Sequence, residues 1–296
     1  MTYGQQEAAH VTYAAPTTLA EAVGALHASG EAAPFAGGTD LLVQYHTRSR
    51  RPRAFIDLKR IPELVGIANT ADGLRIGAAT PAAELTAHPL LRRHFPGVVD
   101  GVALIGSQQI QGRASIGGNL CNGSPAADAV PSLIAAGATL MVTGPDGTRS
   151  LPAAQFIVAP GRTVLQRGEV LEAILLPTPP EGTVSAYLRV TPRTEMDIAV
   201  ASAGVQLTLD PSGRCVAAHV AIGAVAPTAR LVAEAGQRLV GTALDDAAIA
   251  RAADAARAAA QPIDDKRGTA AYRRHVVGVL TARAITRALA RAQGRS

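Results

Sequence analysis

A run of sixteen residues, Arg113 to Asp128, constrains the fold of this chain more than any other stretch. It holds three glycines, two asparagines, two serines and one carboxylate, whereas apolar sequence precedes and follows it. Glycine loses much conformational entropy inside a helix or strand, and Ser, Asn and Asp compete there for backbone hydrogen bonds. We therefore predict a loop held between two core segments. Bare backbone N–H groups in such a loop can approach a ligand closely and bind an anion.

A second glycine loop is expected upstream, over Phe35 to Leu42. A capping box at Thr18 starts a helix before it, residues 33–36 are expected to form a strand, and a helix is expected over 41–48. The loop thus follows the carboxyl end of a strand, where open α/β units bind ligands. Two such loops suggest a ligand with two linked phosphates. For each loop, a tight structural turn without a ligand is the alternative.

Composition excludes several classes of protein. The chain has 296 residues, 48% of them hydrophobic and 17% charged, so we expect a substantial core. The net charge of +5 is modest and mostly scattered, which disfavours nucleic-acid binding. The only cysteines, Cys121 and Cys215, lie far apart, which argues against a disulfide framework or an iron–sulfur cluster and suits the cytoplasm. No secretory signal and no apolar run of roughly 18–20 residues for a membrane span is visible.

The pattern of elements divides the chain at a proline-rich break, 177–180. Before it, helices and strands alternate, so we expect a domain over 1–177 with α/β subdomains of about 1–57 and 58–177. After it, three strands and then helices predict an α+β domain over 181–292, with the helices on one face of the sheet. The expected strands are 184–190, 198–209 and 215–225, and the expected helices are 229–239, 246–259 and 270–292. A helical stretch over 90–110, broken at Pro96–Gly97, is expected before the long loop.

The glycine loops match neither of two common nucleotide-binding motifs. The upstream loop lacks the lysine of a P-loop, and no G-x-G-x-x-G occurs, which disfavours a nucleotide hydrolase and a standard Rossmann domain. What is left is a cradle of backbone N–H groups for a pyrophosphate, with hydroxyls from Thr39 and Ser115. The Asn119 amide can bond a heterocycle or a ribose edge, and the Asp128 carboxylate can accept bonds from ribose hydroxyls.

We expect no catalytic or metal-binding role for the basic run, the histidines or Cys121. The basic run 48–53 is interpreted as a solvated connector, with a docking or nucleic-acid patch as the alternative. The histidines show no metal-ligand spacing. Cys121 is interpreted as a small buried residue beside the loop rather than a nucleophile, because no helix start or neighbouring base marks it as activated.

A resemblance to a known family is carried by motifs spread along nearly the whole chain. They are Gly37-Gly38-Thr39-Asp40-Leu41-Leu42, Ile105-Gly106-Ser107-Gln108-Gln109-Ile110, Ala114-Ser115-Ile116-Gly117-Gly118-Asn119-Leu120, Ser124-Pro125-Ala126-Ala127-Asp128, Tyr187-Leu188-Arg189-Val190, Glu195-Met196-Asp197-Ile198-Ala199 and Tyr272-Arg273-Arg274. With these motifs the chain resembles the FAD-binding medium subunit of the molybdenum hydroxylases, the family of xanthine dehydrogenase and bacterial carbon monoxide dehydrogenase. The resemblance implies an α+β fold: a FAD-binding domain of the vanillyl-alcohol-oxidase type, then a three-stranded sheet with a helix bundle.

The resemblance also implies which residues bind FAD. The two loops cradle the pyrophosphate from opposite sides, Asp128 lies near the adenosine ribose or the flavin side chain, and Leu171 packs near the isoalloxazine. Arg189 stands where the family often has a lysine near the flavin ring, so its permanent charge would tune the flavin potential, with a surface salt bridge as the alternative. The implied cofactor-binding residues are Phe35, Ala36, Gly37, Gly38, Thr39, Asp40, Leu41, Ile110, Ser115, Gly117, Gly118, Asn119, Cys121, Asn122, Asp128, Leu171 and Arg189.

The implied function is electron transfer within a larger enzyme. A large subunit with a molybdopterin cofactor would oxidise the substrate, and a small subunit with two [2Fe–2S] clusters would pass the electrons to FAD in this chain. The acceptor would be NAD, a quinone, a carrier protein or oxygen, and the assembly would hold two copies of each of the three subunits. Two alternatives stay open: a free-standing flavin-dependent reductase or oxidase of the same fold, and a scaffold subunit with a decayed flavin site.

Overall fold

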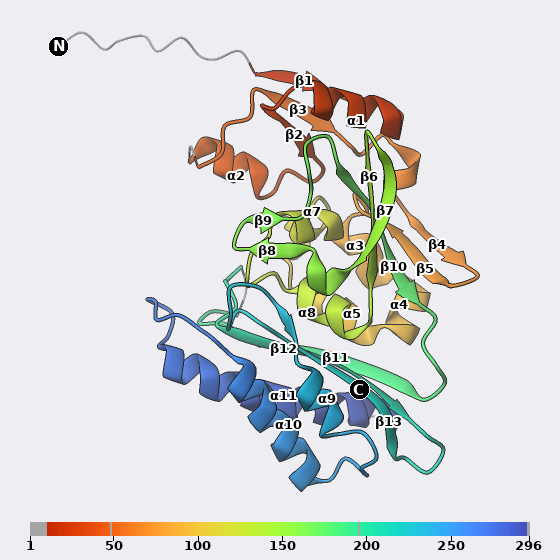
Figure 1. The fold of residues 1–296 in the computed structure, drawn as a ribbon, viewed down its shortest axis with the longest axis vertical. Coiled ribbons are helices and arrows are strands. Elements are labelled where there is room, and N and C mark those ends of the chain that lie inside the picture. The colour runs from red at the N-terminus through yellow and green to blue at the C-terminus, as the bar shows by residue number, and fades with distance from the viewer. Residues whose placement is uncertain (1–10, 48, 195, 295–296) are drawn as a thin grey trace, which may run out of the picture.

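The computed structural model describes residues 11–47, 49–194 and 196–294. Arg48, in the basic run and at the end of an expected helix, and Glu195, in one of the matching motifs, therefore lie outside the described residues. With its long axis vertical, the chain forms three layers that follow one another from the N-terminal strands at the top to the C-terminal helices at the bottom (Figure 1).

The first layer is a small parallel sheet in the order β1–β3–β2. The predicted capping box is present: the Thr18 hydroxyl accepts a bond from the Glu21 N–H at 3.3 Å, and the Glu21 carboxylate accepts one from the Thr17 N–H at 3.1 Å. The predicted glycine loop joins β2 to α2. The elements are β1 (Thr12–Ala14), β2 (Ala32–Phe35), β3 (Ala54–Asp57), α1 (Leu19–Ala28) and α2 (Leu41–His46).

The second layer is an antiparallel sheet in the order β4–β5–β10–β6–β7, covered by short helices. Its strands are β4 (Ile67–Thr70), β5 (Gly73–Gly77), β6 (Thr139–Gly144), β7 (Gly147–Pro152) and β10 (Val170–Pro177), with a side hairpin of β8 (Ile157–Ala159) and β9 (Arg162–Thr163). Its helices are α3 (Ala82–Ala87), α4 (Pro89–His94), α5 (Pro96–Val102), α6 (Gln108–Gln111), α7 (Ile116–Cys121) and α8 (Ala129–Ala135), with 3-10 turns η1 (Pro62–Leu64) and η2 (Ala153–Gln155). Fully buried side chains such as Ile76, Leu140 and Leu133 form the core between sheet and helices.

Two expectations for this layer are wrong. The run 113–128 is not a loop throughout, because Ile116–Cys121 forms the helix α7. The Ser115 hydroxyl caps this helix by accepting a bond from the Gly118 N–H at 3.0 Å, which offsets the cost of its two glycines. The helical stretch before it breaks at Phe95 rather than at Pro96–Gly97. Pro96 is instead the first residue of α5, where its missing N–H costs no hydrogen bond.

The third layer is an antiparallel sheet in the order β11–β12–β13–β14, with helices below it. The predicted strands and the two long helices are confirmed, but the expected helix over 229–239 is wrong at its start, where a short fourth strand precedes a shorter helix. The elements are β11 (Thr183–Val190), β12 (Ala201–Leu209), β13 (Cys215–Gly223), β14 (Arg230–Leu231), α9 (Ala233–Gln237), α10 (Asp246–Ala259) and α11 (Ala270–Ala292).

Helices cover both faces of this sheet, whereas the sequence predicted one covered face. α11 and α9 pack below it, with α10 against these two helices, and α5 and α8 of the second layer pack above it (Figure 1). The upper contact is close: a Cβ at Gly204 of β12 would lie 2.9 Å from the backbone of Pro131. Hydrogen bonds reinforce it, since the Gly97 N–H donates to Ser185 Oγ at 3.0 Å and Arg291 donates to Asp100 at 2.8 Å.

No helix of the described part of the chain, 11–47, 49–194 and 196–294, is both long enough and apolar enough to cross a membrane.

The contact at Gly204 generates a stability prediction. Gly204→Ala should lower the free energy of unfolding by about 1–3 kcal/mol, because the added methyl group meets backbone that cannot rotate away. Gly24→Ala is the matched control, since a Cβ at Gly24 of α1 meets nothing within 4 Å. That control should be neutral or stabilising by about 0.5–1 kcal/mol. Urea unfolding of both variants checks this, and equal stability of the two would contradict the packing described.

Candidate cofactor site

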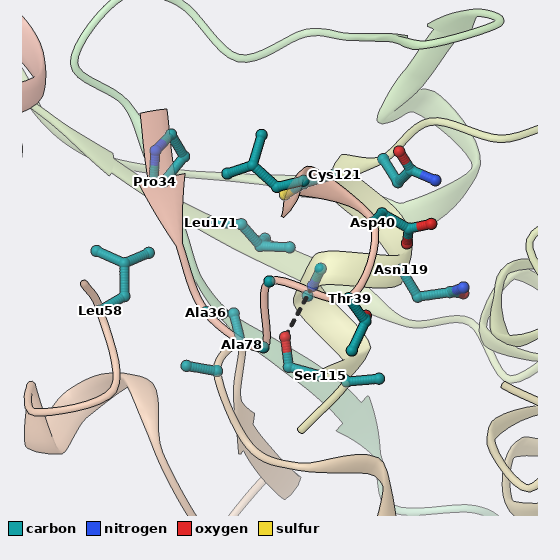
Figure 2. A pocket seen from close by; sticks show the side chains of 18 of the residues that line it. Pro34, Ala36, Thr39, Asp40, Leu58, Ala78, Ser115, Asn119, Cys121 and Leu171 are labelled. Atoms are coloured by element: carbon teal, nitrogen blue, oxygen red, sulfur yellow. Dashed lines mark hydrogen bonds between the residues drawn. The ribbon is translucent and has the colours of Figure 1, made fainter. Parts of the chain in front are cut away.

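A cavity lies where the two glycine loops meet. It encloses about 950 Å³ including its open mouth. Figure 2 shows side chains from both loops around the same space as the apolar side chains of Pro34, Leu58 and Leu171. The β2–α2 loop, the α7 segment and the start of β10 therefore supply much of the site, and other segments, such as the one after β3 that carries Leu58, complete it.

The two loops touch each other at Gly37, and a second glycine, Gly117, lies against the segment that follows β5. A Cβ at Gly37 would lie 2.0 Å from the Arg113 carbonyl oxygen, and one at Gly117 would lie 2.4 Å from the Ala78 carbonyl oxygen. No other residue type fits this approach of backbone to backbone. Farther along, the Gln44 amide of α2 donates to Asn122 Oδ1 at 2.8 Å. These contacts hold α2 and α7 on opposite walls of the cavity.

The first loop presents a row of unbonded backbone N–H groups. Within the described part of the chain, the N–H groups of residues 37–41 donate to no protein acceptor. Gly38 has φ +73°, a conformation that favours glycine. Consecutive N–H groups in such a turn form a concave site for an anion. This row is the part of the cavity best suited to a phosphate.

The second loop contributes differently, because its amides are already used within the protein. The Gly117 N–H donates to the Ala78 carbonyl at 2.9 Å, the Gly118 N–H to Ser115 Oγ, and the Asn119 N–H to the Ser115 carbonyl at 3.0 Å. The loop therefore offers side chains and a close backbone wall rather than a second row of free amides.

Asn119 carries a buried polar atom that lacks a partner. Its Oδ1 is inaccessible to water and accepts no hydrogen bond from the residues that the structure describes. Buried polar atoms are nearly always bonded, so this orphan is unusual, although it exposes no surface to the cavity. The free N–H row fits a ligand that carries phosphates, and a bond from that ligand to Asn119 Oδ1 requires a shift of the Asn119 side chain.

Most of the residues predicted from the sequence line this cavity. They are Ala36, Gly37, Gly38, Thr39, Asp40, Leu41, Ser115, Gly117, Gly118, Asn119, Cys121, Asn122 and Leu171. Phe35, Ile110, Asp128 and Arg189 are not among the lining residues. The Phe35 ring lies 2.6 Å from the Cβ position of Gly38, and Ile110 packs against the Gly106 turn in the same way. Both support the loops without facing the cavity.

Asp128 and Arg189 form a buried ion pair between the second and third layers. Asp128 accepts bonds from Arg189 at 2.5 Å and from the Tyr187 hydroxyl at 2.8 Å, and the Arg189 side chain is only 6% exposed. The alternative of a surface salt bridge for Arg189 is therefore wrong. Burial raises the pKa of Asp128 to about 6, although the charge of Arg189 acts to lower it. The predicted contacts of these two side chains with FAD stay predictions.

Sequence reasoning missed several lining residues. Arg50 lines the cavity although its basic run has the composition of a solvated connector, and its closeness to the glycine loop in sequence was the available signal. The other missed residues are Pro34, Gln44, Leu58, Leu64, Ala78, Ala79, Ile105, Ala114, Leu165, Glu169 and Val170. Most are small or apolar, and only the tertiary fold brings them together.

Cys121 lines the cavity without the marks of a nucleophile. Burial of its thiol raises the pKa to about 12, although the residue as a whole is partly exposed. The thiol is therefore protonated at neutral pH and packs as a small apolar group. No group of His, Cys, Asp and Glu suited to a metal ion occurs within 11–47, 49–194 and 196–294.

The buried pair generates a pH-dependent prediction. Arg189→Met should destabilise the protein by about 3–5 kcal/mol at pH 8, because it leaves an ionised carboxylate buried without its cation. The folded-state pKa of Asp128, already about 6, rises further in this variant. Protonation then favours the folded state, so the loss should shrink as the pH falls to 5.

Urea unfolding at both pH values measures the effect of Arg189→Met. Arg193→Met is the control, since the Arg193 side chain is 72% exposed and pairs with Asp197 at 3.5 Å. It should cost less than about 1 kcal/mol at either pH. A loss for Arg189→Met that is the same at pH 8 and pH 5 would contradict the role given to Asp128.

Comparison with known proteins identifies the family. Residues 8–179 match the FAD binding domain in molybdopterin dehydrogenase, and residues 186–288 match the CO dehydrogenase flavoprotein C-terminal domain. The chain is 38% identical over 282 residues to the carbon monoxide dehydrogenase medium chain of Afipia carboxidovorans, covering 95% of this chain and 97% of that one. It is 31% identical over 286 residues to the xanthine dehydrogenase FAD-binding subunit of Escherichia coli O157:H7, covering 96% and 98%.

A solved structure agrees with these sequence matches. A chain of the reconstituted CO dehydrogenase from Oligotropha carboxidovorans superposes with a TM-score of 0.91 at 36% identity, covering 97% of this chain and 98% of that one. The α+β fold expected from the sequence is thereby confirmed. The chain belongs to the family of FAD-binding medium subunits of the molybdenum hydroxylases, which are oxidoreductases.

Proposed function

We propose that this chain binds FAD in the cavity between its glycine loops and passes electrons through it to an external acceptor. The observation that carries the proposal is the row of backbone N–H groups at residues 37–41, which have no acceptor among the described residues and belong to residues that line the cavity. FAD supplies the redox chemistry, since it takes up electrons singly and releases two together. The residues of this chain bind and orient it.

Within this proposal the two loops have different tasks. The N–H groups of residues 37–41 hold the pyrophosphate, and the hydroxyls of Thr39 and Ser115 add to them. Ser115 Oγ accepts a bond from Gly118, so its own proton is free to be donated to a phosphate oxygen. Asn119 bonds a polar edge of the cofactor. Leu171, only 3% exposed, provides an apolar surface against which a flavin ring can pack.

The names of the relatives support a proposal for the partners. Several are called medium chains, which fits an enzyme that also has a large and a small subunit. We propose that a large subunit with a molybdopterin cofactor oxidises the substrate, and that a small subunit with [2Fe–2S] clusters delivers the electrons. The acceptor is NAD, a quinone, a carrier protein or oxygen. We further propose two copies of each subunit and a cytoplasmic location, where free thiols such as Cys121 and Cys215 persist.

The proposal predicts that this chain retains FAD after mixing and desalting. Gly118→Asp should weaken FAD binding by about tenfold or more, because it adds a negative charge to the wall of a phosphate site. A Cβ at Gly118 would lie 3.0 Å from Ser115 Oγ, so a side chain, charged or neutral, displaces this hydroxyl, and only a comparison at equal size isolates the effect of the charge.

Gly118→Asn is the matched control, since it adds nearly the same atoms without the charge. Visible flavin absorbance of the desalted chain reports the bound fraction for all three proteins. Equal retention by the Asp and Asn variants would contradict a phosphate beside Gly118. No retention by the wild-type chain, alone or copurified with its partner subunits, would favour a scaffold subunit with a decayed site.

A further inference from the structure

Lys59 lies behind the first glycine loop and is not part of the cavity lining. Its ammonium group donates to the Ala36 carbonyl at 2.9 Å and to Asp57 Oδ1 at 2.7 Å. It also lies 4.5 Å from the centroid of the Phe35 ring, close enough for a cation–π contact. One side chain therefore contacts two successive residues of the segment that leads into Gly37.

Asp57 fixes the position of Lys59. This carboxylate, at the end of β3, is 5% exposed and also accepts bonds from the Lys59 N–H at 2.9 Å and from the Tyr13 hydroxyl. Burial acts to raise the pKa of Asp57, but the bonds from Lys59 and Tyr13 outweigh it and hold the pKa below its ordinary range. Asp57 thus stays ionised and keeps the ammonium group beside the loop.

The bond to Ala36 has a consequence for the next amide. The carbonyl and the following N–H of a trans peptide point in opposite directions, and the chain has no cis peptide bond among its described residues. Because the Ala36 carbonyl is directed at Lys59, outside the cavity lining, the Gly37 N–H is directed away from Lys59. The Phe35 ring, which lies beside the ammonium group, also packs against Gly38. A Cβ added to Gly38 would lie 2.6 Å from this ring.

We propose that Lys59 is a positioning residue for the cofactor, which holds the Ala36 peptide so that the amides from Gly37 onward are presented to the pyrophosphate of FAD. The inference rests on the proposed function of this loop. Lys59 does not line the cavity itself, so it acts through the backbone of Ala36, which does. Its charge is balanced by Asp57, so the role rests on the bond to the Ala36 carbonyl rather than on attraction for an anion.

The test measures the dissociation constant for FAD in the full chain. Lys59→Met removes the ammonium group but keeps an apolar stem on Phe35, and should weaken FAD binding by about tenfold, the effect expected for one bond to a charged group. Lys59→Arg should recover most of the affinity, because a guanidinium can donate to both Ala36 and Asp57. Lys266→Met is the matched control, since it removes the same charge from an exposed lysine.

The outcomes separate the inference from the function on which it rests. Wild-type affinity in Lys59→Met, or an equal loss in Lys266→Met, would overturn the role of Lys59 and leave the flavin site intact. A wild-type chain that binds no FAD would overturn both. If Lys59→Met does not fold, as its thermal unfolding would show, the double variant Lys59→Met with Asp57→Asn replaces it, because it leaves no unpaired buried carboxylate, and it is expected to show the same loss.

Discussion

The backbone N–H groups of residues 37–41 have no hydrogen-bond acceptor within the described protein. An N–H group without an acceptor destabilises the folded state unless water or a ligand bonds it. A row of five such groups therefore indicates a binding site. The row begins where β2 leaves the parallel sheet. On its other side, Gly37 lies directly against the Arg113 carbonyl, a contact that only glycine allows. A ligand with two linked phosphates satisfies these groups, because its oxygens can accept bonds from several successive amides at once.

The second loop links this row to the rest of the molecule. α7 forms a wall of the cavity, and Asp128, seven residues after its end, is the residue that directly precedes α8. Asp128 is bonded to Tyr187 and Arg189 of β11, while α8 packs on β12 and β13. The cavity and the C-terminal sheet are therefore joined through one short stretch of chain.

Local signals predicted the elements that build the site. The capping box at Thr18, the strand before Gly37 and the helices around the long loop all follow from patterns a few residues long. The strands β4 and β7 were missed because their side chains are mostly exposed, which erases the apolar alternation on which such predictions depend. The helix α7 was missed because glycine normally disfavours a helix, and only the contact of Gly117 with Ala78 shows why glycine is needed there.

The lining of the cavity was predictable only in part, for a different reason. Glycines and polar residues in a loop mark a binding site by their chemistry alone, but Arg50, Ala78 and Leu165 become neighbours only through the tertiary fold. Lys59 carries no motif at all, and its role appears only from its bond to Ala36. Asp128 and Arg189 differ from these residues. The sequence analysis names both as cofactor-binding, whereas the structure places them in an ion pair outside the cavity lining.

Hydrogen–deuterium exchange of the segment 36–42, with and without FAD, tests the central claim most directly. Amides that lack a protein acceptor exchange quickly, so this segment should exchange rapidly in the chain without cofactor and become protected when FAD is added. The amides of Gly117 and Gly118, which are already bonded within the protein, should change much less. Binding of FAD without added protection at 36–42 would contradict the account, because the cofactor would then be held elsewhere.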